Sequence, residues 1–120
     1  MREAPYRLDR RAADIVMEAV REVCIVRDWH LVAAHVRCTH VHCVVGNIER
    51  PNRVVADFKA YASRALNQVE GYRRRWAREG STRRLPDNAA ISSAVRYALY
   101  SQGDRMAVYV SNPRAHATGL

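Results

Sequence analysis

The sequence has few of the residues and segments that mark several classes of protein. Its three cysteines, Cys24, Cys38 and Cys43, are an odd number without framework spacing, so a disulfide-stapled fold is not expected. No hydrophobic segment near residue 1 precedes a cleavage site, and no apolar run approaches the roughly 20 residues of a membrane-spanning helix. We therefore expect a reduced, cytosolic protein that does not enter a membrane.

Lysine is also nearly absent, which determines the kind of positive charge on the surface. Lys59 is the single lysine among 20 basic residues, and the formal net charge is +8. Arginine forms paired hydrogen bonds with phosphates and stacks on bases, and each neutralised phosphate releases counterions. The composition favours a nucleic-acid partner, but charge alone also suits basic proteins that bind none.

The chain of 120 residues is long enough for one domain with a buried core. We expect residues 1–110 to form this domain and residues 111–120 to form a flexible tail. Apolar residues recur at helical spacing in three segments, and three others have strand character. The helical segments are 12–26, 54–69 and 91–99, and the strand segments are 31–36, 38–45 and 106–110.

The resulting order, helix, strand, strand, helix, helix, strand, predicts an α+β fold with helices on one face of an antiparallel sheet. The short connection between the first two strands favours an antiparallel hairpin. Asn52 and Asp87 are candidate N-caps of the second and third helices. The other face of the sheet, which bears His40 and His42, is left for a ligand or another subunit.

The segment His40-Val41-His42 places two imidazoles two residues apart in a strand. Alternate side chains of a strand point to the same side of the sheet, so the two rings form half of a metal site while Val41 and Cys43 face the core. A hydrogen-bonded structural pair of histidines is the alternative. Zinc is the other metal alternative, with Cys38 and Cys43 as further ligands, but ligands on one straight strand cannot surround a tetrahedral ion.

The segment between the second and third helices combines arginines with aromatic rings. Charge for the backbone and flat faces for unstacked bases suit a single-stranded nucleic acid. A solvated basic loop is the alternative. The candidate nucleic-acid-binding residues are Arg73, Arg74, Arg75, Trp76, Arg78, Arg83 and Arg84.

Tyr97 lies off the apolar stripe of the third helix, which makes it a candidate nucleophile. Attack of a phenol on a phosphodiester gives a covalent phosphotyrosine that preserves the bond energy for rejoining, and a divalent cation would stabilise the charge that develops on the phosphate. The remaining histidines, His30, His35 and His116, are expected to have ordinary roles.

Four segments in order resemble the single-tyrosine HUH transposases, in particular the REP-associated tyrosine transposases and their insertion-sequence relatives. They are the His40-Val41-His42 triplet, the helix Phe58-Lys59-Ala60-Tyr61-Ala62-Ser63-Arg64-Ala65-Leu66-Asn67, the loop Glu79-Gly80-Ser81-Thr82-Arg83-Arg84-Leu85, and Ala94-Val95-Arg96-Tyr97 running to Gln102. The similarity covers most of residues 6–110.

The resemblance implies a ferredoxin-like fold, a homodimer and a place in the bacterial cytoplasm. It also implies an endonuclease for DNA transposition and recombination, which uses Mg²⁺ or Mn²⁺ to cut and join single-stranded DNA near hairpins. By this resemblance His40, His42 and Gln102 are metal ligands. Tyr97 is the nucleophile that takes a 5′-phosphate and leaves a 3′-hydroxyl.

The chain departs from the family in two places. Gln102 follows Tyr97 by five positions, whereas the insertion-sequence enzymes have their glutamine one turn after the tyrosine. Almost no residues precede the first helix, where family members have a strand, so we expect this strand to be absent, removed by a truncated start, or supplied by a partner. Two alternatives stay open: a relative that binds nucleic acid without cutting it, and a metal-dependent nuclease that uses water.

Overall fold

The computed structural model describes residues 6–76, 85–100 and 107–111. Its elements follow the predicted order, and the three strands form one antiparallel sheet in the order β2-β1-β3. The predicted α+β class with an antiparallel sheet is confirmed. The elements are α1 (Arg10–Arg27), β1 (His30–Val36), β2 (Val41–Gly46), α2 (Pro51–Glu70), α3 (Asn88–Tyr100) and β3 (Ala107–Val110).

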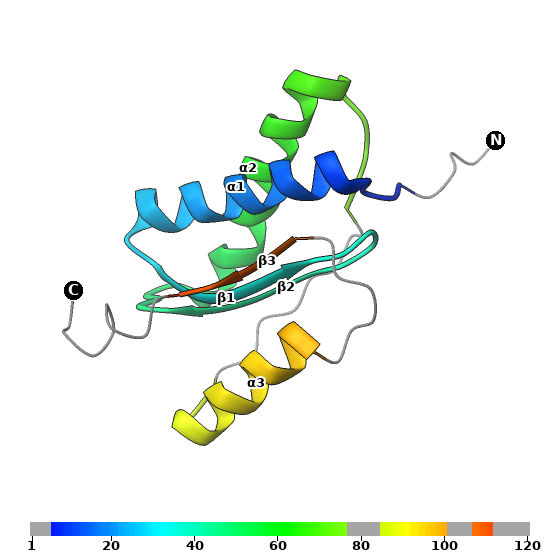
Figure 1. Ribbon diagram of the computed structural model, residues 1–120. Coiled ribbons are helices and arrows are strands. Elements are labelled where there is room, and N and C mark those ends of the chain that lie inside the picture. Colours follow the sequence, from blue (N-terminus) through cyan, green and yellow to red (C-terminus); the bar gives the residue numbers. More distant parts are fainter. Residues whose placement is uncertain (1–5, 77–84, 101–106, 112–120) are drawn as a thin grey trace.

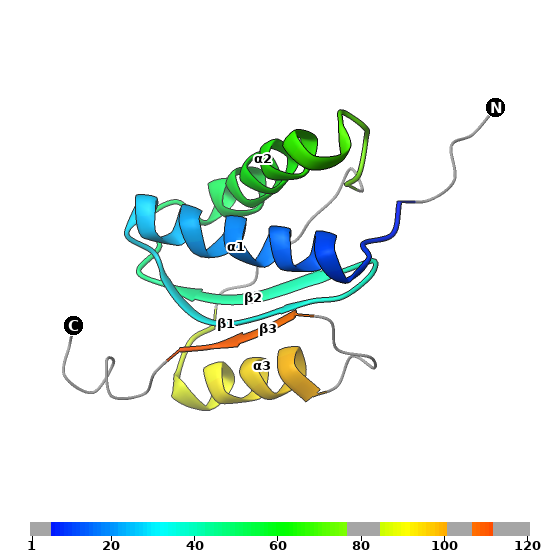
Figure 2. The same ribbon diagram turned by 45° about the horizontal axis from the view of Figure 1, so that its top comes forward.

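The helices lie on both faces of the sheet. α1 and α2 pack together on one face, as expected, and α3 lies on the opposite face against β1 and β2 (Figures 1 and 2). The sequence had placed all helices on one face, and α3 is the correction. Ala33 and Val44 make the second face apolar, and Leu99 covers them with Ile91 and Val95 around it.

The larger core lies between the sheet and the first two helices. Val16 and Val20 of α1 and Leu66 of α2 are almost completely buried against Ala34 and Val36 of β1. Burying one such aliphatic side chain contributes roughly 1.5–3 kcal/mol. This core therefore holds the β1–β2 hairpin in place under α1 and α2.

A bulge in β1 decides which side chains of that strand face α3. Leu31 pairs with Val45 and Ala33 pairs with Val44, so Val32 is an extra residue on β1. After the bulge Ala34 and Val36 face α1, while Ala33 and His35 face α3. Without the extra residue, His35 would share a face with Leu31, which packs in the α1 core.

The helix boundaries show which capping predictions hold. The Asp87 carboxylate accepts a hydrogen bond from the backbone N–H of Ala90 at 2.8 Å, so the predicted cap of α3 is confirmed. The prediction for Asn52 is wrong, because α2 begins at Pro51 after Arg50 and has no side-chain cap. Proline suits the first helical position, since its φ angle is already helical and its missing N–H would have no partner there.

The two ends of the described chain bear on two further predictions. No strand precedes α1 within residues 6–9, although the backbone N–H of Leu8 donates to the carbonyl of Cys38. Ser111 extends the β3 pairing by donating its backbone N–H to Val32, and the rest of the predicted tail lies outside the described residues. None of the helices in the described part of the chain combines the length and apolarity needed to span a bilayer.

Candidate metal and nucleophile site

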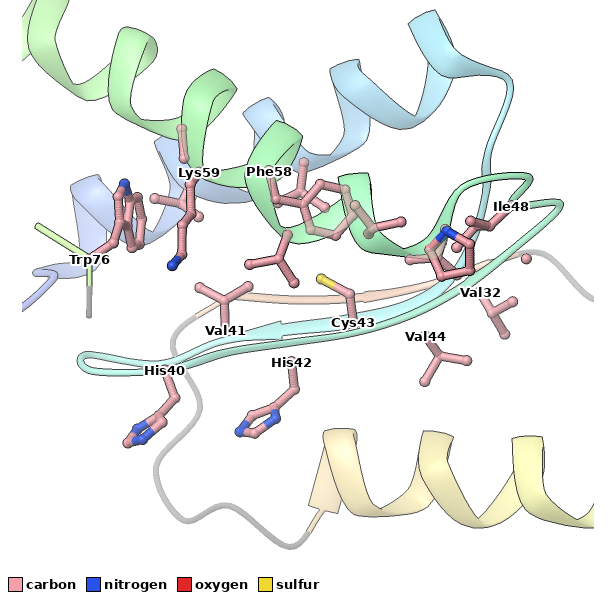
Figure 3. A pocket seen from close by; sticks show the side chains of 18 of the residues that line it. Val32, His40, Val41, His42, Cys43, Val44, Ile48, Phe58, Lys59 and Trp76 are labelled. Atoms are coloured by element: carbon pink, nitrogen blue, oxygen red, sulfur yellow. The ribbon is translucent and has the colours of Figure 1, made fainter. Parts of the chain in front are cut away.

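The two imidazoles of the His-Val-His triplet lie side by side on the α3 side of the sheet. Figure 3 shows His40 and His42 on that side, whereas Val41 and Cys43 point the opposite way, toward α2. The ring centroids of His40 and His42 are 6.0 Å apart and their planes differ by 9°. The predicted alternation of side chains is confirmed from His40 to Cys43, but β2 begins at Val41, so His40 lies just before the strand and not within it.

Tyr97 approaches the same imidazoles from a different element. Its ring centroid lies 6.1 Å from that of His42, with the two rings nearly perpendicular at 87°. The side chain of Tyr97 remains 56% exposed, so a ligand has access to it. This convergence depends on α3 lying on the histidine face, whereas the sequence analysis had placed all helices on the other face.

The ring nitrogens of the two histidines are suited to holding a cation. His40 Nδ1 lies 2.8 Å from the hydroxyl oxygen of Thr39, and Nε2 of His42 is buried without a hydrogen-bond partner among the described residues. Burial lowers the pKa of His42, and the neighbouring His40, His35 and Arg37 lower it further. A neutral imidazole keeps the lone pair with which histidine binds a metal.

His40 and His42 are two candidate ligands for a cation, and the described residues do not include the third that was predicted. Gln102, the ligand that the family resemblance implies, lies outside the described residues. No three His, Cys, Asp or Glu side chains in the described ranges are gathered as a metal site. Cys43 is not a candidate zinc ligand beside the imidazoles, because its side chain points to the α2 side (Figure 3). The thiol of Cys38 accepts a hydrogen bond from Arg7.

His35 is a residue of this site that the sequence analysis missed. It lies directly opposite His42 in the antiparallel pair and is fully buried. Its Nδ1 lies 2.7 Å from the carbonyl oxygen of Ala98, next to Tyr97, and its Nε2 has no hydrogen-bond partner among the described residues. The sequence contained a signal for this contact. If the two strands form a hairpin that turns at residues 37–40, His35 pairs with His42.

Two residues of the predicted nucleic-acid surface have partners inside the fold. The side chain of Arg75 is enclosed, and its guanidinium bonds to Glu70, Asn67 and the carbonyl of Gly71. The indole of Trp76 donates to the hydroxyl of Ser63. These two residues make contacts within the fold, to α2 and to the segment after it, and their assignment to a nucleic-acid surface stays a prediction.

The other basic residues of that segment have different surroundings. Arg74 is exposed, and the guanidinium of Arg73 lies over the ring of Tyr6 at 4.7 Å from its centroid. Arg78, Arg83 and Arg84 lie outside the described residues. The exposed arginines stay candidates for contact with a nucleic-acid backbone.

An open cavity of about 1180 Å³ borders the hairpin. Val41, Cys43 and Phe58 line its apolar part, and Lys59 and Trp76 lie at one end (Figure 3). These side chains occupy the α2 side of β2, whereas the imidazoles project to the other side. The lining also includes His40, His42 and Val44, which point to the α3 side, so the cavity borders both faces of β2 (Figure 3).

In comparisons with known proteins, no family model, curated protein or solved structure matches the chain. The functional argument therefore depends on the motifs and on the arrangement of His40, His42 and Tyr97.

Proposed function

We propose that the protein cuts and rejoins single-stranded DNA through a covalent bond to Tyr97. The observation that supports this proposal is the convergence of the Tyr97 phenol, from α3, and the His42 imidazole, from β2, at 6.1 Å between ring centroids. A phenol beside neutral imidazoles that could hold a divalent cation is a combination that suits phosphotyrosine chemistry. The resemblance to the single-tyrosine HUH transposases adds hairpin DNA as the substrate, a homodimer as the working unit, and Mg²⁺ or Mn²⁺ as the cofactor.

The proposed reaction divides the work between the phenol and the histidines. The oxygen of Tyr97 bonds to the phosphorus as the bond from phosphorus to the 3′ oxygen breaks. The phenol loses its proton and the leaving 3′ oxygen gains one, which gives a 5′-phosphotyrosine and a free 3′-hydroxyl. Attack of a 3′-hydroxyl on the phosphotyrosine reverses these changes and rejoins the strand.

His40 and His42 would hold the divalent cation, with Gln102 as the third ligand implied by the resemblance. The cation would neutralise charge on the phosphate oxygens during the displacement. The buried Nε2 of His42, which has no hydrogen-bond partner in the described structure, fits this role because it is otherwise a costly group to bury. His42 also borders Tyr97, so a phosphate held by the cation would lie beside the phenol.

The test is an assay for a covalent complex between the protein and labelled hairpin DNA that carries a single-stranded flank. With Mg²⁺ or Mn²⁺, the unmodified chain is expected to give a band that resists denaturation. Tyr97→Phe should lower its formation by at least about a thousandfold, as loss of a nucleophile does in other covalent enzymes. Tyr100→Phe is the matched control, because Tyr100 is exposed on the same helix one turn away.

The same assay separates the alternatives. A nuclease that uses water would cleave the DNA without forming a covalent band. Its cleavage would persist in Tyr97→Phe and would disappear in His42→Ala. Binding without any cleavage would identify a nucleic-acid-binding protein. The five-residue spacing from Tyr97 to Gln102 supports this second candidate function, and the covalent band would exclude it.

A further inference from the structure

The contact between His35 and α3 joins the central strand of the sheet to the helix that carries Tyr97. A carbonyl oxygen cannot donate a hydrogen bond, so His35 Nδ1 must carry the proton and donate it to Ala98 at 2.7 Å. In the neutral ring this leaves Nε2 with the lone pair. The ring is fully buried, so this hydrogen bond forms away from water.

The Ala98 carbonyl belongs to the last turn of α3, which ends at Tyr100. The last four carbonyls of a helix have no donor within the helix, and a buried one needs a partner from elsewhere. His35 supplies that donor from β1. The interaction therefore holds the end of α3 at one height above the sheet.

The apolar contacts of α3 do not by themselves determine that height. Leu99, Ile91 and Val95 pack on Ala33 and Val44, but apolar attraction has no direction and tolerates sliding and rotation. A slip of one residue moves a helical side chain by about 1.5 Å along the axis and about 100° around it. Such a slip would carry Tyr97 away from His42.

We propose that His35 is a positioning residue, which places Tyr97 beside His42 by donating its Nδ1 proton to the Ala98 carbonyl. This inference rests on the proposed function for its effect on cleavage, but the placement of the two rings is a property of the free protein. A displacement of about 1 Å at a reacting group can cost about a hundredfold in rate. His35 thus affects the reaction through α3 and does not itself touch the DNA.

A competing role for His35 is direct metal ligation through Nε2. A metal-bound histidine often donates its other N–H to a backbone carbonyl, as His35 does. Within the described residues, however, His35, His40 and His42 are not gathered as a metal site. The hydrogen bond fits both roles, but the lack of such a three-histidine group among these residues favours positioning, and the experiment includes ligation as an outcome.

Three substitutions distinguish the two nitrogens of His35. The amide N–H of asparagine lies close to the place of Nδ1, and the amide of glutamine reaches the place of Nε2, whereas leucine fills the volume without a donor. We expect His35→Asn to keep cleavage within about threefold of the unmodified chain. We expect His35→Leu and His35→Gln to lower kcat by about 10- to 100-fold at saturating DNA, with the Kd for single-stranded DNA within about twofold.

Two measurements on the free protein do not depend on cleavage. Ring-to-ring nuclear Overhauser effects between Tyr97 and His42 should persist in His35→Asn and disappear in His35→Leu and His35→Gln. The ¹⁵N shifts of the unmodified chain should report the proton of His35 on Nδ1. Failure of the cleavage assay with these contacts intact would reject the proposed function and leave the positioning role standing.

Several results would overturn the inference. One is a proton on Nε2 of His35 in the unmodified chain. Another is that His35→Leu keeps both the contact between the Tyr97 and His42 rings and the unmodified kcat. The third is that kcat falls in all three variants in proportion to their melting temperatures. Mn²⁺ binding that is kept in His35→Gln and lost in His35→Asn would identify His35 as a metal ligand instead. The ¹⁵N measurement applies even if a variant does not fold.

Discussion

His42 is a residue whose charge is set by its surroundings. Burial disfavours the imidazolium, and His40, His35 and Arg37 lower its pKa further. Because the ring stays neutral as the pH falls toward the ordinary value, its lone pair remains available to a cation. The same environment that makes His42 costly to bury therefore makes it useful at a metal site.

A pH titration by NMR should give His42 a pKa below the ordinary value of 6.5. The unfolded chain then takes up a proton near pH 6.5 that the folded chain does not, so this residue lowers the stability of the fold as the pH falls below that value. In His42→Asn, the loss of melting temperature on acidification should be smaller. A pKa at or above the ordinary value would contradict the described environment of the ring.

Two of the three thiols are expected to be unreactive. Burial raises the pKa of Cys24 to about 11, and burial together with Cys24 raises the pKa of Cys43 to about 12. At pH 8 only about one thiol in a thousand at Cys24 and one in ten thousand at Cys43 would be a thiolate, which is the reactive form. These two residues should therefore resist iodoacetamide, although Cys43 is partly exposed like Cys38, and Cys38 should be modified first.

Mass spectrometry after timed labelling measures the three sites separately. Unfolding in guanidinium chloride is the control, because it should bring all three cysteines to similar rates. Fast modification of Cys43 in the folded chain would show that the cavity beside it admits more water than its surroundings indicate.

Among the elements, α3 carries Tyr97, which lies beside His42 of β2 although the two elements are far apart in sequence. Asp87 caps its first turn and His35 bonds to its last turn. Between these ends the contact with the sheet is apolar. The two polar interactions at its ends therefore define where the helix begins and how high it lies.

Removal of the α3 cap tests this view of the element. Asp87→Ala should lower the free energy of unfolding by about 1 kcal/mol, a typical effect for loss of an N-cap. It should also lower formation of the covalent complex, because it loosens the helix that carries Tyr97. Asp9→Ala is the matched control, since Asp9 caps α1 through Ala12 at 2.7 Å.

Denaturant titration and the covalent-complex assay measure these two effects independently. Asp9→Ala should cost similar stability and leave formation of the complex nearly unchanged at temperatures where the protein is folded. Equal losses of the complex in both variants would mean that global stability, and not the placement of α3, limits the reaction.

At the scale of the whole molecule, the arginines divide into those that contact solvent and those that hold the fold together. Arg74 is exposed, whereas Arg75, the next residue, is enclosed by Glu70, Asn67 and Gly71. The pairing of Arg75 with Glu70 leaves the net charge of +8 unchanged, but it takes one arginine side chain off the surface. Arg74 and Arg75, although adjacent in sequence, therefore have different surroundings.

Substitution of this adjacent pair separates the two roles. Arg74→Ala should lower the slope of log binding constant against log salt by about 0.7, the value for one phosphate contact on a single strand. Arg75→Ala should instead cost about 1–3 kcal/mol of stability, because it leaves polar partners less well satisfied. Filter binding at several salt concentrations and thermal melting provide the measurements, and a reversal of the two effects would refute this division.

Local alternation and composition determined much of this protein before any tertiary contact. The pleat of β2 places His42 on one side and Val41 and Cys43 on the other, and His40, the residue before the strand, continues the alternation. The helical periods likewise locate α1, α2 and α3, and the amide geometry of a first turn makes Asp87 a cap. These features depend on neighbours within a few residues.

Tertiary structure alone decided how distant residues meet. Because of the bulge at Val32, the side chain of His35 faces α3. α3 packs on the apolar side chains of Ala33 and Val44, which places it on the histidine face. Packing at the end of α2 encloses Arg75, which composition assigned to the surface. The physical reason is the same in each case: burial and hydrogen bonding depend on which elements come together in space, and spacing along the chain does not specify that.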